Sequence, residues 1–229
     1  MGASFRLRLA SPDDLPSVLG LIENAAAWLR TMGTTQWQRP WPDREERDRR
    51  VHDSLSAGET WLLWDGSTPM ATITLTPEPD DLLWTAQERE EPALYLHRLV
   101  VHRKHAGLGI GAHLLDWAGV RARRRHLARW IRIDVWADNH ALHRYYLRQG
   151  FRLVRRSTSI PGYPAGALFQ KDVRNARLSR RVPFETDPPS ENGSGPHEGE
   201  EAAAPLRESA PAPAHRTRPC ARTPRLPRP

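Results

Sequence analysis

The fold is decided by the segment Tyr95-Leu-His-Arg-Leu-Val-Val-His-Arg-Lys-His-Ala-Gly-Leu-Gly-Ile-Gly-Ala-His-Leu-Leu115. It predicts an apolar strand that runs through a glycine-rich turn into an amphipathic helix. Glycine lets the backbone approach a ligand closely, and the first turn of a helix offers unpaired N–H donors with a favourable dipole. The segment therefore predicts a cradle for an anion, with phosphate or pyrophosphate as the natural occupant.

The residues that can form a core are unevenly distributed along the 229-residue chain. All nine Trp precede residue 137, whereas the segment from Arg174 onward holds 11 of the 21 Pro and has Phe184 as its one aromatic residue. Such a composition cannot bury enough apolar surface to fold. We therefore expect a single domain over residues 1–173 and a disordered Pro/Arg-rich tail over residues 174–229.

The formal charge of +7 does not by itself select a partner. A basic balance suits a polyanionic cofactor as well as nucleic acid, and neither the domain nor the tail is strongly basic, so nucleic-acid binding is not expected. The single Cys220 allows no disulfide within the chain and no cysteine cluster for a metal. No apolar run of about 18 residues and no N-terminal signal pattern is present, so we expect a cytoplasmic protein without membrane contact or metal.

The order of predicted elements is β-α-α-β-β-β-α-β-α-β-β. Hairpins alternate with crossovers in this order, which predicts a mixed rather than a parallel sheet. The expected strands are 5–9, 60–64, 70–76, 93–101, 130–136, 151–157 and 167–173, and the expected helices follow Ser11, begin at Asp43, run from Gly109 to about Arg125, and extend from Asp138/Asn139 to Gly150.

Two kinds of protein use a turn like this one. The residues Gly107-Leu-Gly109-Ile-Gly-Ala112 satisfy the fingerprint G-x-G-x-x-G/A of dinucleotide-binding folds, which would imply hydride transfer. In that fold, however, the glycines directly follow the strand within repeated βαβ units. Here His102-Arg-Lys-His-Ala intervenes and a hairpin precedes the strand, which argues against a dinucleotide.

The second use is found in the GNAT superfamily of acetyltransferases. The residues Gly109-Ile-Gly-Ala-His-Leu-Leu115 resemble the turn on which that superfamily binds the pyrophosphate of coenzyme A. Further along, Asn139-His-Ala-Leu-His-Arg-Tyr-Tyr146-Leu-Arg-Gln-Gly-Phe151 is similar to its later motif, an Asn followed by a Tyr placed before Gly-Phe. With the matching order of elements, the resemblance covers roughly residues 4–173.

This resemblance implies an α/β (α+β) acyl-CoA acyltransferase fold. It consists of a mixed, mostly antiparallel sheet of about seven strands flanked by about four helices, with a V-shaped splay between two central parallel strands. It implies an acetyl-CoA-dependent N-acetyltransferase that transfers the acetyl group to a primary amine directly in a ternary complex. The acceptor is expected to be a small-molecule amine, and the protein a monomer or homodimer. Alternatives are a macromolecular amine, of a protein or aminoacyl-tRNA, and a non-catalytic coenzyme A sensor.

The resemblance also assigns cofactor-binding residues. The superfamily usually has Arg or Gln three residues before Gly109, where this chain has Ala106, so Arg103, Lys104 or His105 nearby, or the backbone amides alone, are expected to replace that contact. The complete expected set is Leu99, Val100, Val101, Ala106, Gly107, Leu108, Gly109, Ile110, Gly111, Ala112, Asn139 and Tyr146.

Two residues are expected to be catalytic. Tyr146 matches the tyrosine that reaches the sulfur in the superfamily and is a plausible proton donor to a thiolate, whereas Tyr145 points about 100° away on the helix. His97 matches a histidine of serotonin N-acetyltransferase that helps to deprotonate the amine, and a packed structural role is its alternative. Asp134 on the adjoining strand either orients a base, holds a cationic substrate or is structural.

The acceptor site is the least legible part of the sequence. The loop with Trp37 and Trp41, and the acidic loop Pro77–Pro92 with Trp84, either cover the cleft or contribute to the core. The run Arg121-Ala-Arg-Arg-Arg125 resembles a nucleic-acid patch, but cations at a helix C-terminus are favourable in any protein.

Overall fold

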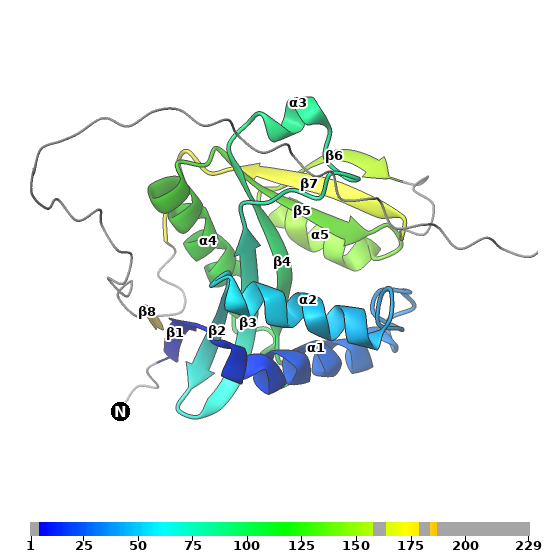
Figure 1. The fold of residues 1–229 in the computed structure, drawn as a ribbon, viewed down its shortest axis with the longest axis vertical. Helices are drawn as coiled ribbons and strands as arrows, with labels where there is room; N and C mark the ends of the chain where they lie inside the picture. Colours follow the sequence, from blue (N-terminus) through cyan, green and yellow to red (C-terminus); the bar gives the residue numbers. More distant parts are fainter. Residues whose placement is uncertain (1–4, 158–163, 179–183, 187–229) are drawn as a thin grey trace, which may run out of the picture. The chain divides into compact units, whose positions relative to one another are not determined.

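A central strand, β4 (Ala93–Val101), organises the sheet of this protein. The computed structural model describes residues 5–157, 164–178 and 184–186. Within them the strand order is β6-β7-β5-β4-β3-β2-β1-β8 (Figure 1). The other strands are β1 (Phe5–Leu9), β2 (Thr60–Asp65), β3 (Thr68–Thr76), β5 (Trp130–Trp136), β6 (Arg152–Ser157), β7 (Gly166–Asp172) and β8 (Phe184–Thr186).

The pairing of β4 with β5 is short and parallel. It covers only Ala93–Tyr95 against Trp130–Arg132, although both strands continue beyond it. Each strand remains paired on its other side, β4 with β3 and β5 with β7, both antiparallel. The two central strands therefore diverge, which confirms the predicted V-shaped splay in a mixed sheet.

A β-bulge lies in β4 where the splay opens. His97 is opposite Thr74 and Val100 is opposite Thr72, so two residues, Arg98 and Leu99, face the one residue between those partners. Arg98 has φ 49°, a left-handed conformation that is uncommon for a residue with a side chain. The bulge shifts the alternation of β4 by one residue, because Leu96 packs with the core on one face of the sheet and Val100 with the core on the other.

Helices cover both faces of the sheet. On one face, α1 (Leu15–Leu29) and α2 (Arg44–Ser56) pack against Leu62 and Val100. On the other, α4 (Ile110–His126) and α5 (His140–Arg148) pack against residues that include Leu63 and Ile73. Neighbours such as Leu62 and Leu63 therefore belong to opposite cores, as strand alternation requires.

Two features were not expected from the sequence. The acidic loop 77–92 contains a short helix, α3 (Ala86–Arg89), which begins with a capping box between Thr85 and Glu88. The strand β8 lies beyond residue 173, the predicted end of the domain, and pairs in parallel with β1. Residues 179–183 and 187–229 of the predicted tail lie outside the described residues, so the predicted boundary at residue 173 stays a prediction.

The contact between α4 and the sheet is expected to dominate the stability of the domain. Leu114 is completely buried there, so Leu114→Ala removes apolar contacts and leaves a cavity. We expect this variant to lower the free energy of unfolding by about 3 kcal/mol, measured by urea denaturation. Leu147 on α5 is 50% exposed and provides the control, and a loss of similar size in Leu147→Ala would contradict this account.

Candidate active site

A cavity of about 1010 Å³ is lined by the strands at the splay and by α1 and α2. From the strands come Leu96 to Leu99 of β4 and Ile133 to Trp136 of β5. Tyr146 of α5 reaches it as well, so His97, Leu99 and Tyr146, three of the predicted site residues, line one space. The glycine turn, residues 106–112, is not part of this lining.

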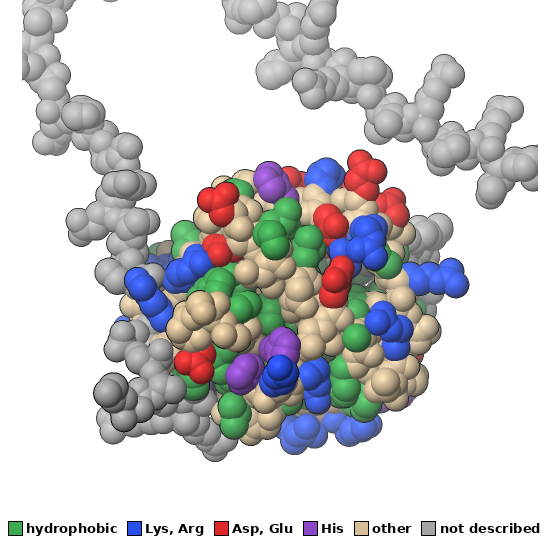
Figure 2. Space-filling view, turned by 90° about the horizontal axis from the view of Figure 1, so that it is seen from below, with side chains coloured by type: hydrophobic (Ala, Val, Ile, Leu, Met, Phe, Trp, Pro, Cys, Tyr) green, Lys and Arg blue, Asp and Glu red, His purple; other side chains and the backbone are tan. Residues whose placement is uncertain are grey.

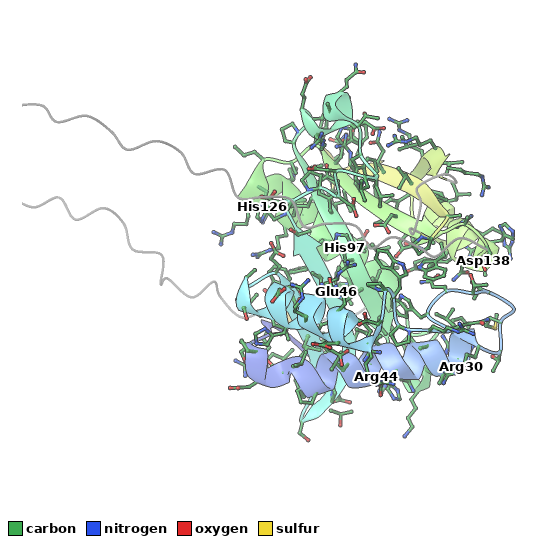
Figure 3. The ribbon with its side chains drawn as sticks, turned by 45° about the vertical axis from the view of Figure 1, so that its right-hand side comes forward. Arg30, Arg44, Glu46, His97, His126 and Asp138 are labelled. Carbon is green, nitrogen blue, oxygen red and sulfur yellow. The ribbon has the colours of Figure 1, made fainter. Side chains whose placement is uncertain are left out.

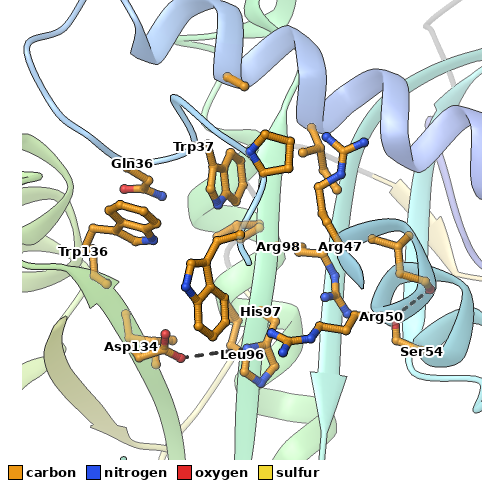
Figure 4. A pocket seen from close by; sticks show the side chains of 18 of the residues that line it. Gln36, Trp37, Arg47, Arg50, Ser54, Leu96, His97, Arg98, Asp134 and Trp136 are labelled. Atoms are coloured by element: carbon orange, nitrogen blue, oxygen red, sulfur yellow. Dashed lines mark hydrogen bonds and ion pairs between the residues drawn. The ribbon is translucent and has the colours of Figure 1, made fainter. Parts of the chain in front are cut away.

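His97 and Asp134 face each other across the splay. Their nearest atoms, Nδ1 and Oδ1, are 3.9 Å apart, and each side chain is about one third exposed. In Figure 3, His97 lies beside α2, which carries Glu46. Figure 4 shows His97 directed toward Asp134 within the cavity. Asp134 was left open in the sequence, and its position on the cavity wall favours a role at the site over a purely structural one.

The protein environment reverses the usual order of the two pKa values, in which the carboxyl group has the lower pKa and the imidazole the higher one. Burial, and then the positive charge of Arg98, lowers the pKa of His97 to about 4. Burial, and then the negative charge of Asp80, raises the pKa of Asp134 to about 6. At neutral pH the imidazole is therefore neutral and able to accept a proton, while Asp134 is largely ionised and able to attract a cation.

The two adjacent tyrosines of α5 face different parts of the molecule. Tyr146 is 5% exposed, packs edge-on against Phe151 and lines the cavity. Burial raises the pKa of its hydroxyl above the usual value, so this group stays protonated. Tyr145 instead lies against the start of α4, where its hydroxyl oxygen would be 2.8 Å from a Cβ at Gly111. Burial raises the pKa of Tyr145 to about 12.

The glycine turn has the geometry of an anion cradle. Gly107 and Gly109 have φ of 86° and 76°, values that a residue with a side chain rarely adopts, and Gly109 is the N-cap of α4. Ala106 to Gly109 are exposed. The first N–H groups of the long helix α4 therefore begin at an open glycine turn, which fits a pyrophosphate group. Arg103 and Lys104 beside it are also exposed.

The comparisons with known proteins agree with this geometry. The family model "Acetyltransferase (GNAT) family" matches residues 23–151. The chain belongs to the GNAT family. It is 34% identical over 164 residues to a protein of Bacillus subtilis (strain 168) described as an uncharacterized N-acetyltransferase, YesJ, covering 70% of this chain and 86% of that protein. On these findings the GNAT protein described here is an N-acetyltransferase.

Solved structures of acetyltransferases share its fold. A GNAT acetyltransferase of Listeria monocytogenes has a TM-score of 0.58 and 25% identity, covering 73% of this chain and 94% of that one. RimL, a ribosomal L7/L12 α-N-protein acetyltransferase in complex with coenzyme A, has a TM-score of 0.52 and 19% identity, covering 75% of this chain and 95% of its own. The second similarity concerns the fold alone.

Asn139 has a structural role in this GNAT protein. It is the N-cap of α5, where its side chain accepts a hydrogen bond from the backbone N–H of Leu142 at 3.0 Å. Its amide nitrogen also donates to Oε1 of Gln36 at 2.6 Å, and both side chains are buried. The side chain therefore fixes α5 to the loop that carries Trp37. The predicted contact of Asn139 with the cofactor stays a prediction.

The tryptophans predicted for the acceptor site divide into two groups. Trp37 and Trp41 line the cavity, as does Trp136 of β5. Trp84 does not line the cavity, because it is 2% exposed and packs edge-on against Tyr95 at a centroid distance of 5.7 Å. The interpretation that Trp84 covers the cleft is therefore wrong, and the alternative, that Trp84 contributes to the core, is correct.

The sequence did not identify the arginines of this GNAT site. Arg98 lines the cavity from the bulge, and Arg47 and Arg50 line it from α2. Arg98 is a cation within an otherwise apolar strand segment, and that position could have indicated a role at the site. The direction of its side chain, however, depends on the bulge. Arg121 by contrast stacks on Trp61 at 4.3 Å and is not a free basic residue.

No surface of one charge is apparent on the face shown in Figure 2, where basic, acidic and apolar side chains are intermingled. Among the described residues there is no group of three or more His, Cys, Asp or Glu that could hold a metal ion. In the same part of the chain, no helix is both long and apolar enough to cross a membrane.

The cap at Asn139 provides a test of how α5 is held. Asn139→Ala removes the cap and leaves the buried Gln36 without its donor, so we expect the free energy of unfolding to fall by about 2 kcal/mol. Thermal or urea unfolding measures this change. Arg144 is exposed on the same helix, and Arg144→Ala is expected to change stability by less than about 0.5 kcal/mol. Equal effects in the two variants would exclude the capping role.

Proposed function

We propose that this GNAT protein transfers the acetyl group of acetyl-CoA to the primary amine of a small molecule, directly and in a ternary complex. The observation that carries the proposal is the meeting of His97, Leu99 and Tyr146 on one cavity at the open end of the β4–β5 splay. The glycine turn at the start of α4 would bind the pyrophosphate, and the pantetheine arm would extend from there along β4 into the splay. The cavity on the α1/α2 face would then receive the amine.

The chemistry requires that the amine be neutral when it attacks. Asp134 attracts the ammonium form, and His97, neutral at pH 7, accepts its proton directly or through water. The amine nitrogen then forms a bond to the carbonyl carbon of the thioester, with a backbone N–H near Leu99 as donor to the developing oxyanion. The carbon–sulfur bond breaks, and the thiolate takes a proton from the Tyr146 hydroxyl, which lines the cavity.

Removal of the Tyr146 hydroxyl tests the proton donor. Tyr146→Phe keeps the ring and its packing, so we expect it to retain thermal protection by acetyl-CoA while kcat falls about 100-fold, measured as thiol release with a panel of amines. Tyr145→Phe is the matched control and is expected to keep kcat, because that hydroxyl lies against Gly111 outside the cavity lining.

The alternatives give different results in the same assay. Thermal protection without thiol release for any small amine, but with release for a protein or aminoacyl-tRNA, would favour the macromolecular acceptor. Protection without release for any acceptor would favour a sensor. An unchanged kcat in Tyr146→Phe would refute the assigned role.

The pH dependence tests the His97–Asp134 pair. The pKa of Asp134 is raised to about 6, so its ionised form, which attracts the ammonium, increases as pH rises through 6 and is lost below it. We expect kcat/KM of the wild type to fall more steeply below pH 6 than above it. In Asp134→Asn this additional fall is expected to be absent, with a lower kcat/KM near pH 7. A wild-type profile of constant slope from pH 5 to 7 would contradict the assignment.

A further inference from the structure

The charges that line the cavity are balanced. Six arginines and six carboxylates line it, so its net formal charge, with His neutral, is zero. Figure 4 shows Arg47, Arg50 and Arg98 gathered on the α2 side, away from Asp134 and Trp136 on the side of β5. The electrostatic effect of Asp80 on both His97 and Asp134 extends the acidic side. A cavity that holds charges of both signs and has no net charge suits a zwitterion better than a polycation or a polyanion.

Arg98 lines the cavity without a carboxylate partner from the part of the chain that the structure describes. Its Nη2 donates to the Ser54 hydroxyl at 2.8 Å, while its Nε is buried and has no hydrogen-bond partner. None of the ion pairs among the described residues involves Arg98, and Glu59, which lines the same cavity, affects it only at longer range. Burial lowers the pKa of Arg98 to about 10, so the group remains charged at neutral pH.

The neighbouring arginines are already paired. Arg50 donates from Nε to Glu46 at 2.8 Å, and Arg47 forms an ion pair with Asp48 at 2.5 Å. A guanidinium inside the protein that has no carboxylate partner is costly, and a ligand carboxylate is the anion whose two oxygens match its geometry. Arg98 follows His97 directly in β4 and lines the same cavity as Asp134, so a ligand carboxylate on Arg98 would hold an amine of the same molecule in the space that His97 and Asp134 line.

We propose that the acceptor of this GNAT protein is an amino acid, whose carboxylate binds Arg98 and whose amine lies at Asp134 and His97. The walls formed by Trp37, Trp41 and Trp136 suit an apolar or aromatic side chain. This inference rests on the proposed function and adds the class of substrate. Arg98 is then a specificity-determining residue: it binds a part of the acceptor that takes no part in bond formation.

The test compares amines that differ only in the carboxylate. Thiol release from acetyl-CoA is measured with L-phenylalanine, L-methionine and L-tryptophan, and with phenethylamine, 3-(methylthio)propylamine and tryptamine, which lack it. For the best pair, we expect the wild type to favour the amino acid by about 10- to 100-fold in kcat/KM, and Arg98→Gln to lose most of that preference through KM. Arg124→Gln, an exposed change on α4, is the control and is expected to keep the preference.

Folding of the variant is followed separately. Acetyl-CoA is expected to protect Arg98→Gln against heat as it protects the wild type, and Arg98→Lys to retain part of the preference because it keeps the charge. If the wild type favours the amines without a carboxylate, or if Arg98→Gln slows both members of a pair equally, the amino-acid inference fails and the proposed acetyl transfer stands. If none of the six compounds causes thiol release, the amino-acid inference fails; if acetyl-CoA also gives no thermal protection, the proposed function fails with it.

Discussion

The arrangement of this site depends on one constraint, the limited pairing between β4 and β5. Three residues on each strand pair, and beyond them the strands separate while each stays hydrogen-bonded to its outer neighbour. The bulge at Arg98 allows β4 to remain paired with β3 while its side chains change faces. If β4 and β5 were paired along their whole length, His97 and Asp134 would be neighbours in a continuous sheet. That sheet would lie between Tyr146 and the space on the α1/α2 face, and Tyr146 could not line the cavity.

The same constraint explains the charges of the site. A continuous sheet between two layers of helices buries both faces, which excludes unpaired ionisable groups. At the splay, His97, Arg98 and Asp134 occupy a layer that is otherwise apolar, and their pKa values move accordingly. The charged groups of this site therefore lie where the sheet is interrupted, whereas Arg132, buried in the paired part of β5, is held by Glu91 and Gln170.

Much of the fold could be predicted because its determinants are local in sequence. The glycine turn, the alternation of Trp130–Trp136 and the Asn139 cap each specify nearby backbone, and the resemblance to the GNAT family supplied the splay. The orientation of Arg98 could not be predicted, because it depends on a bulge defined by pairing with a strand about 25 residues earlier. The burial of Trp84 was equally hidden, since its partner Tyr95 lies beyond an intervening helix. Strand pairing and packing between distant segments thus limited what could be predicted, because neither can be inferred from residue type alone.

Helix α5 has one further consequence. Tyr145 rests on Gly111 at the start of α4, and Tyr146 reaches the cavity from the next position in the chain. One turn of helix therefore places one tyrosine against the start of α4 and the next on the wall of the cavity, so α5 connects the glycine turn with the cavity. Any side chain at Gly111 would meet the Tyr145 hydroxyl, so this glycine leaves the room that the tyrosine needs where the two helices meet.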